Sequence, residues 1–87
     1  METRTNISNN LKYIKADKNL TLEKVGDNLK KIRSEKKITQ QSLADNFGCG
    51  QSYISLLEGG DVDIQICTIV DLAKALGVTT NEILKGI

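Results

Sequence analysis

The 87-residue chain has 39% hydrophobic residues, two tyrosines, one phenylalanine, no tryptophan, no proline and a formal net charge of +1. Its length allows one small domain, and its composition favours short helices packed through aliphatic side chains. Histidine, the commonest general base and metal ligand, is absent, and Cys49 and Cys67 form neither a CxxC pair nor a zinc set. We therefore expect no enzyme activity, no metal and no cofactor.

Charge is distributed unevenly along the chain. Residues 1–37 hold ten basic and five acidic residues, a net +5, whereas residues 38–87 hold two basic and six acidic residues, a net −4. No apolar run approaches the roughly 18 to 20 residues of a membrane span, and the N-terminus lacks a signal-peptide core. We expect a cytoplasmic protein whose function accounts for a basic first part and an acidic second part.

Residues 1–20 are expected to form a basic extension to a domain over residues 21–87. Residues 10–25 match residues 28–43 at six identical positions. Eighteen residues make five helical turns, so an amphipathic helix can produce this echo by coincidence; partial duplication is the alternative. We predict an extra basic helix over about residues 9–18, with disorder as the alternative.

From residue 21 onward, caps and glycines mark the helix ends. Thr21 is expected to cap a first helix, whose apolar positions recur on one face. Thr39 is expected to cap a second helix of about eight residues, which Gly48 ends. A fourth helix is predicted to stop at Gly77, and a capping box with Thr79 predicts a last helix over about residues 80–85.

The third expected helix, residues 51–58, has two different sides. Ile54, Leu57 and Glu58 share one side, which predicts contact with the core. The opposite side is available to a partner and carries Gln51, Ser52, Ser55 and Leu56.

Four segments of this helical pattern resemble the Cro and phage-repressor family of helix-turn-helix proteins, also called the XRE family. The segments are Val25-Gly26-x-x-Leu29-x-x-Ile32-Arg33, Ile38-Thr39-Gln40-x-x-Leu43-Ala44-x-x-Phe47-Gly48, Gln51-Ser52-Tyr53-Ile54-Ser55-x-Leu57-Glu58-x-Gly60 and Leu72-Ala73-Lys74-Ala75-Leu76-Gly77-Val78. The resemblance covers residues 25–84. It implies an all-α, five-helix lambda-repressor-like domain, here with an extra N-terminal basic helix, in which the third helix enters the major groove of double-stranded DNA.

The resemblance also implies roles for individual residues. Gln51 is expected to pair with an adenine edge, Ser52 and Ser55 to bond to bases, and Leu56 to meet a thymine methyl group. The alternatives are solvated polar side chains and, for Leu56, contact with a partner protein. Contacts to the DNA backbone are expected from Lys37, Thr39, Gln40 and Tyr53, and a structural ion pair from Arg33 and Glu58.

The loop over residues 59–63 departs from the family, because it is acidic where phosphate-binding residues are usual. No Lys or Arg occurs between residues 38 and 73. A positive field for DNA must therefore come from the first part of the chain. Its candidate sources are Lys30, Lys31, Lys36 and Lys37, together with Lys12, Lys15 and Lys18.

These observations predict a sequence-specific transcriptional regulator, most simply a repressor, that acts as a homodimer on a roughly palindromic operator. The apolar C-terminal stripe of Ile83, Leu84 and Ile87 is expected to contribute to the dimer. The alternative is an antitoxin-like module that binds a protein such as a toxin and binds DNA only secondarily.

Overall fold

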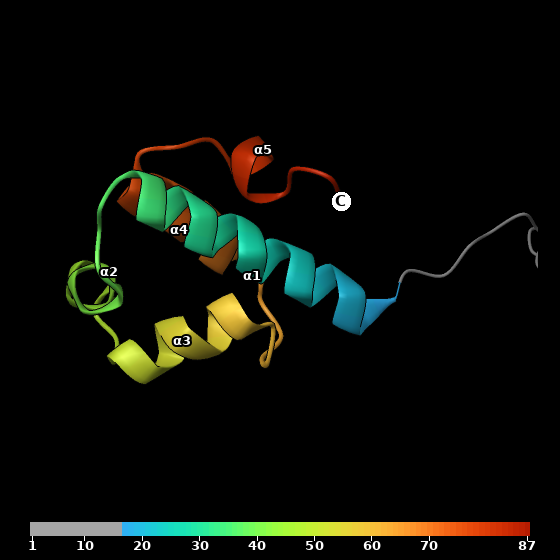
Figure 1. Ribbon diagram of the computed structural model, residues 1–87, viewed down its shortest axis with the longest axis horizontal. Coiled ribbons are helices and arrows are strands. Elements are labelled where there is room, and N and C mark those ends of the chain that lie inside the picture. Colours follow the sequence, from blue (N-terminus) through green and yellow to red (C-terminus); the bar gives the residue numbers. More distant parts are fainter. Residues whose placement is uncertain (1–16) are drawn as a thin grey trace, which may run out of the picture.

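The part of the chain that the structure describes, residues 17–87, is helical throughout apart from short connections in this computed structural model (Figure 1). This confirms the predicted all-α fold with five helices. The helices are α1 (Lys18–Glu35), α2 (Gln40–Phe47), α3 (Gln51–Gly59), α4 (Ile66–Leu76) and α5 (Thr80–Ile83).

Four of the predicted helix ends are present, at Thr39, Gly48, Gly77 and Thr79. The Thr39 hydroxyl oxygen accepts a hydrogen bond from the Ser42 N–H at 3.0 Å, and the Thr79 hydroxyl oxygen accepts one from the Glu82 N–H at 3.3 Å. Each satisfies a backbone donor that the first helical turn leaves free. Gly48 ends α2 with a φ of +83°, in the left-handed region that glycine adopts without steric cost.

The predicted start of the first helix is wrong by one turn. Asp17 caps α1, and its Oδ1 accepts from the Leu20 N–H at 3.1 Å. Thr21 lies inside the helix and donates its hydroxyl to the Asp17 carbonyl oxygen at 2.9 Å. Aspartate caps at least as well as threonine and also brings negative charge to the positive end of the helix dipole.

Two further boundaries shift. Because α1 begins at Lys18, the expected division between residues 20 and 21 falls within this helix. Residues 9–16 of the predicted extra helix lie outside the part of the chain that the structure describes. At the other end, α5 stops at Ile83, two residues earlier than expected.

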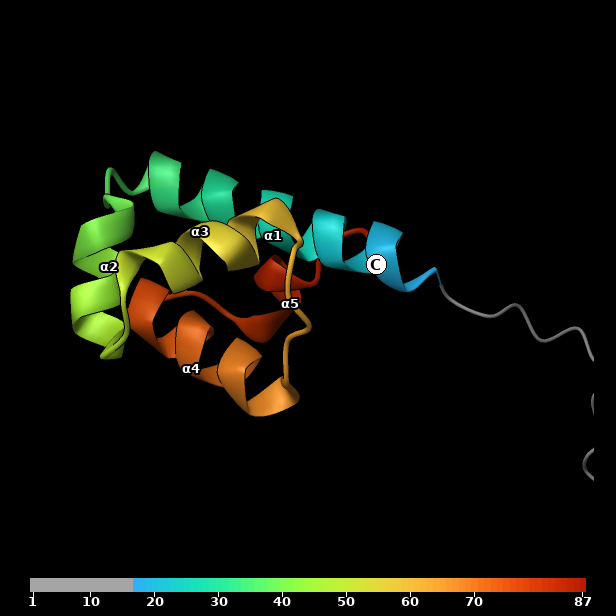
Figure 2. The same cartoon turned by 90° about the horizontal axis from the view of Figure 1, so that it is seen from below.

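The core lies between α1, α3 and α4, with α2 and α5 closing it at the sides (Figures 1 and 2). Ile83 of α5 is completely buried, so its predicted place in an exposed apolar stripe is wrong; only Leu84 and Ile87 of that stripe are exposed. The buried apolar side chains are Val25, Leu29, Leu43, Ala44, Ile54, Leu57, Ile69, Leu72, Ala73, Leu76 and Ile83.

Helix α1 makes two contacts that hold other helices in place. At Gly26 its backbone passes so close to α3 that an added Cβ would lie 2.5 Å from the Glu58 carbonyl oxygen. Two residues later, the Asn28 amide donates to the carbonyl oxygens of Ile83 at 2.7 Å and Lys85 at 2.9 Å. The first contact positions α3, and the second holds the end of α5.

Candidate nucleic-acid interface

Helix α3 presents a continuous exposed side. Gln51, Ser52, Ser55 and Leu56 are all exposed, while Ile54 and Leu57 on the opposite side are buried. Figure 2 looks toward this helix, with α2 beside its start. The four residues predicted to read bases thus share one accessible surface.

The starts of α2 and α3 meet through their side chains. The Gln51 Nε2 donates to the Gln40 Oε1 at 2.9 Å, although the two residues belong to different helices. Thr39 immediately precedes Gln40 and is engaged in capping α2. The structure therefore brings together three of the residues predicted for DNA contact.

Arg33 and Glu58 form the expected ion pair, which ties the last turn of α1 to the end of α3. The Arg33 Nε lies 2.5 Å from Glu58 Oε2, and the Arg33 Nη2 lies 3.1 Å from Glu58 Oε1. Only 13% of the Arg33 side chain and 4% of the Glu58 side chain are exposed. The hydrogen bond to Glu58 raises the pKa of Arg33, against the opposing effect of burial.

The ion pair connects to α2 as well. The Arg33 Nη1 donates to the Ile38 carbonyl oxygen at 2.7 Å, and the Gln40 Nε2 donates to Glu58 Oε1 at 2.9 Å. Hydrogen bonds therefore run without interruption from Arg33 through Glu58 and Gln40 to Gln51. Sequence reasoning missed the two bonds of Gln40, because neither partner is a sequence neighbour and both approach it only through helix packing.

Comparison with known proteins agrees with this geometry. The model of a family described as "Helix-turn-helix domain" matches residues 26–87. The chain is 32% identical to the restriction-modification controller protein C.AhdI from Aeromonas hydrophila, with a TM-score of 0.68 over 71% of this chain and 94% of that one. The chain belongs to the XRE-like helix-turn-helix family.

Other solved structures are similar over a comparable length. The restriction-modification controller protein C.Esp1396I is 34% identical, with a TM-score of 0.66 over 74% of this chain and 86% of that one. The clp gene regulator ClgR from Corynebacterium glutamicum is 26% identical, with a TM-score of 0.72 over 78% of this chain and 72% of that one. A search of curated protein sequences finds no match. Family and fold are those of DNA-binding transcription regulators, which are not enzymes.

The other two residues predicted to contact the DNA backbone are Tyr53, in α3, and Lys37, in the turn before α2. Tyr53 is half-buried and packs against the core, so its ring contributes to stability wherever its hydroxyl points. Lys37 is exposed in the turn before α2 and has a φ of +59°. This is the left-handed region, which is strained for a lysine.

The candidate sources of positive charge do not share one surface. Lys31 lines a hollow with Lys24, Glu82 and Lys85 between α1 and α5, away from the contact of α1 with α3. Lys18 forms an ion pair with Asp63, in which the Lys18 Nζ lies 3.0 Å from the Asp63 Oδ2. Lys12 and Lys15, two more of the predicted sources, lie outside the described residues. Apart from Lys37, this leaves Lys30 and Lys36 as the described lysines among these sources that belong neither to this hollow nor to this ion pair.

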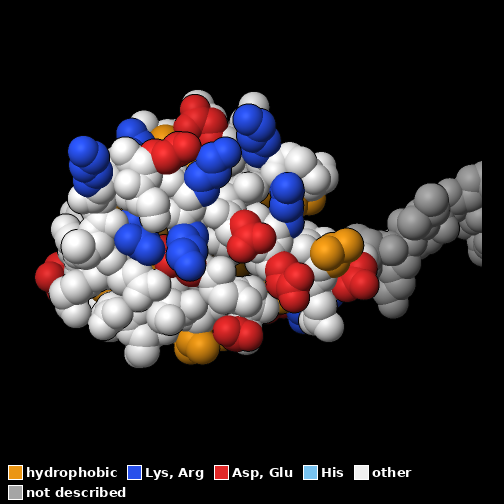
Figure 3. Space-filling view, in the orientation of Figure 1, with side chains coloured by type: hydrophobic (Ala, Val, Ile, Leu, Met, Phe, Trp, Pro, Cys, Tyr) orange, Lys and Arg blue, Asp and Glu red, His pale blue; other side chains and the backbone are white. Residues whose placement is uncertain are grey.

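The ion pair between Lys18 and Asp63 also neutralises one of the acidic charges of the loop after α3. Both side chains are more than two-thirds exposed, and the hydrogen bond from Lys18 lowers the pKa of Asp63. Figure 3 shows acidic side chains gathered where α1 begins and the loop after α3 runs. Lys18 of α1 therefore compensates the charge of Asp63 in this loop.

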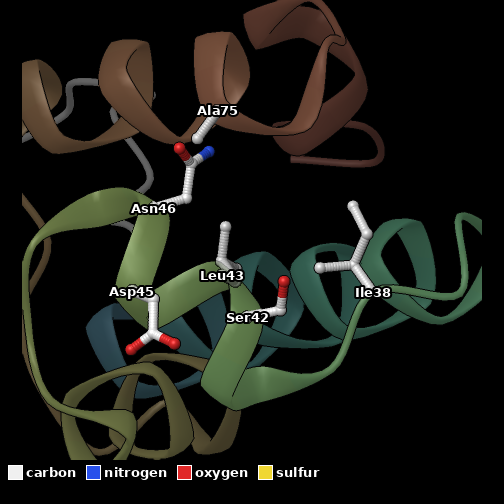
Figure 4. Close-up of a pocket in the computed structure, with 6 residues that line it drawn as sticks. All are labelled: Ile38, Ser42, Leu43, Asp45, Asn46 and Ala75. Carbon is white, nitrogen blue, oxygen red and sulfur yellow. The ribbon is translucent and has the colours of Figure 1, made fainter.

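A shallow hollow lies along the seam between α2 and α4, where Asn46 points toward Ala75 (Figure 4). Its other lining residues are Ile38, Ser42, Leu43 and Asp45. Leu43 belongs to the buried core, so the hollow is the open edge of helix packing.

Within residues 17–87, no group of three His, Cys, Asp or Glu residues is placed to hold a metal ion. No described helix has the length and hydropathy needed to cross a membrane.

Proposed function

We propose that this protein is a sequence-specific transcriptional regulator that inserts α3 into the major groove of double-stranded DNA. The observation that carries the proposal is the common exposure of Gln51, Ser52, Ser55 and Leu56 on α3, beside the start of α2. A major groove admits one α-helix. Gln51 would pair with adenine N6 and N7, the serines would bond to base edges, and Leu56 would contact a thymine methyl group.

Contacts to phosphate would position the protein without specifying sequence. The start of α2 supplies free backbone N–H groups and the positive end of a helix dipole, with Thr39 and Gln40 at this end. Lys37 adds a cation immediately before it, and Tyr53 adds a hydroxyl from the flank of α3. These four residues are the proposed contacts to the DNA backbone.

We further propose that two copies act together on a palindromic operator and repress by covering a promoter. Leu84 is 37% exposed and Ile87 is 59% exposed at the C-terminus. Leu20, 64% exposed, borders the same surface, since it lines one hollow together with Ile87. Contiguous apolar side chains of this kind support an isologous contact between copies. Two-fold symmetry would place half-sites about one helical turn apart.

The gene control exerted by two relatives favours a narrower role. Both C.AhdI and C.Esp1396I are restriction-modification controller proteins, at 32% and 34% identity. Control of a restriction-modification system is therefore the more specific candidate. A reporter fused to the DNA upstream of such genes would change expression when this protein is supplied.

The deciding experiment measures DNA binding by the full chain alone. We expect the purified protein to enrich a palindromic sequence from a random duplex library. Gln51→Ala should relax preference at one position in each half-site, at a cost of about 1–3 kcal/mol, with folding intact. Equal loss for every sequence would make Gln51 a phosphate contact. Binding only in the presence of a second protein would favour the antitoxin-like module.

The dimer has its own test. Leu84→Asp combined with Ile87→Asp should yield a monomer in analytical ultracentrifugation, because both changes place charge in the apolar contact. Lys74→Asp is the control, since this exposed α4 residue lies outside the proposed surface. A dimer that survives the double change would overturn the proposed contact.

A further inference from the structure

The buried charge of Glu58 bears on which way the amide of Gln51 faces. Glu58 is 7% exposed and is held by two hydrogen bonds from the Arg33 guanidinium. A guanidinium is always charged and has no acceptor atom, so it stabilises the ionised carboxylate. An ionised carboxylate can only accept hydrogen bonds. Any side chain that bonds to Glu58 must therefore present a donor.

Gln40 meets this requirement in one orientation only. Its Nε2 donates to Glu58 Oε1 at 2.9 Å, and so its Oε1 is directed to the other side, toward the start of α3. There it accepts from the Gln51 Nε2 at 2.9 Å. Reversing the Gln40 amide would place its oxygen against the carboxylate, which repels it. The charge on Glu58 thus selects the direction of both hydrogen bonds.

The consequence reaches the exposed end of Gln51. With one N–H of its Nε2 engaged by Gln40, the remaining N–H and the Oε1 are the groups left for a base. One donor and one acceptor in a fixed arrangement complement adenine, which offers the N7 acceptor and the N6 donor in the major groove. An amide free to rotate by half a turn would present these groups in either order.

We propose that Glu58 is a positioning residue for base recognition, which acts through Gln40 to fix the amide orientation of Gln51. This inference rests on the proposed function, because it assigns Gln51 to a base edge. It adds a role for a buried residue that never reaches DNA: Glu58 sets the selectivity of α3 as well as its packing against α1.

The principal variant is Gln40→Met, which preserves side-chain length but removes the amide and leaves Arg33 and Glu58 paired. Gln41→Met is the matched control, because Gln41 is the next residue of α2 and its amide bonds only to Asp45 Oδ1, at 2.8 Å, in the described part of the chain. Glu58→Gln is the second variant. It retains the size of the side chain but allows its amide group to donate to Gln40 as well as to accept from it.

The first measurement uses the free protein, so it does not depend on DNA binding. The side-chain amide protons of Gln51 should show resolved nitrogen-15 NMR signals with slowed exchange in the unmodified protein and in Gln41→Met. In Gln40→Met these signals should move to the values of a solvated glutamine. Solvent-like signals in the unmodified protein would overturn the proposal.

The second measurement is base preference on a random duplex library. Gln40→Met and Glu58→Gln should each lower the preference for adenine at the Gln51 position by about tenfold, which corresponds to 1.4 kcal/mol. Preferences at the Ser52 and Ser55 positions should be retained. An unchanged preference at the Gln51 position in folded Gln40→Met would overturn the proposal, even if the protein binds DNA as proposed.

The two measurements separate the possible failures. One outcome is that the NMR signals behave as expected but neither the unmodified protein nor any variant selects a DNA sequence. In that case the relay of hydrogen bonds is real and the proposed function is wrong. If Gln51→Ala relaxes a base preference that Gln40→Met leaves intact, the proposed function holds and the positioning role is wrong.

Discussion

Within residues 17–87, two ion pairs tie α1 to other parts of the fold, one to α3 and one to the loop that follows α3, and they differ in nearly everything except their chemistry. Arg33 and Glu58 are almost completely buried where α1 meets α3. Lys18 and Asp63 meet in solvent, with 68% and 69% of their side chains exposed, where α1 begins. When one partner of a buried pair is removed, the remaining charge stays buried without a counter-ion. When one partner of an exposed pair is removed, water hydrates the remaining charge. Burial, more than distance, therefore decides how much an ion pair contributes to stability.

The largest effect is expected from breaking the buried pair. Glu58→Ala should lower the free energy of unfolding by about 3–5 kcal/mol, because it leaves the Arg33 guanidinium buried without its counter-ion. Urea unfolding followed by circular dichroism measures this. The double variant Arg33→Met with Glu58→Leu should lose less than Glu58→Ala, since no isolated charge remains. A loss below about 1 kcal/mol for Glu58→Ala would place this pair with ordinary surface pairs.

The next effect concerns the close packing of α1 against α3 at Gly26. Gly26→Ala should destabilise the protein by about 1–3 kcal/mol, the usual cost of overpacking, since the new Cβ would lie 2.5 and 2.7 Å from the carbonyl oxygens of Glu58 and Leu57. Thermal unfolding measures the loss. Gly50→Ala is the control, because its Cβ would approach only the Ser52 hydroxyl, at 3.8 Å. Equal stability of the two variants would mean that α1 and α3 can separate without cost.

A smaller effect, of opposite sign, is expected beside the buried pair. Lys37→Gly should stabilise the fold by about 0.5–1 kcal/mol, because relief of the left-handed strain exceeds the entropy cost of glycine. Lys36→Gly is the matched control: it also removes one positive charge, but at a φ of −87°, so it should destabilise. Chemical unfolding of both variants checks the signs.

The same two variants test the proposed phosphate contact. Lys37→Gly should weaken binding to all duplex sequences and make the salt dependence shallower by nearly one unit for each lost contact. Fluorescence anisotropy at several salt concentrations measures this. If Lys36→Gly has the same effect, Lys37 supplies general charge and makes no specific contact.

The smallest effect is expected at the exposed pair. Asp63 has a lowered pKa in the folded protein, so its contribution to stability is present above the ordinary aspartate pKa and is lost as the pH falls through the lowered value. Lys18→Gln should return the Asp63 pKa toward its ordinary range, as measured by carbon-13 NMR titration. Salt should reproduce the change by screening the pair. A large loss of stability at neutral pH would show that exposure does not protect against the loss of a partner.

Much of the fold could be predicted from local signals. Thr39 and Thr79 act within one turn of their own helices, and Gly48 needs only its own backbone conformation, so their roles are legible in sequence. The same kind of signal failed at Thr21, because Asp17 offers an equally suitable cap four residues earlier. Local rules identify candidate caps but do not rank two candidates separated by one turn.

The candidate site was predictable only in part. The exposed side of α3 follows from helical spacing, and the partnership of Arg33 with Glu58 followed from a family resemblance. The bond that Gln40 donates to Glu58 and the bond that it accepts from Gln51 depend on how α2 crosses α3. The burial of Ile83 likewise depends on α1 and α4 covering a four-residue helix. No periodicity within one segment contains that information.

Helix α1 bears on the geometry of the proposed dimer. It holds α3 at Gly26 and, through the Asn28 amide, the carbonyl oxygens of Ile83 and Lys85 near the C-terminus. These two positions lie within one turn of α1, about 3 Å apart along its axis. If two copies join through the C-terminal segment, the separation of their two α3 helices is therefore fixed by packing on α1 and not by a flexible tether. In the proposed dimer, a fixed separation would make binding depend on the spacing of the two half-sites as well as on their sequence.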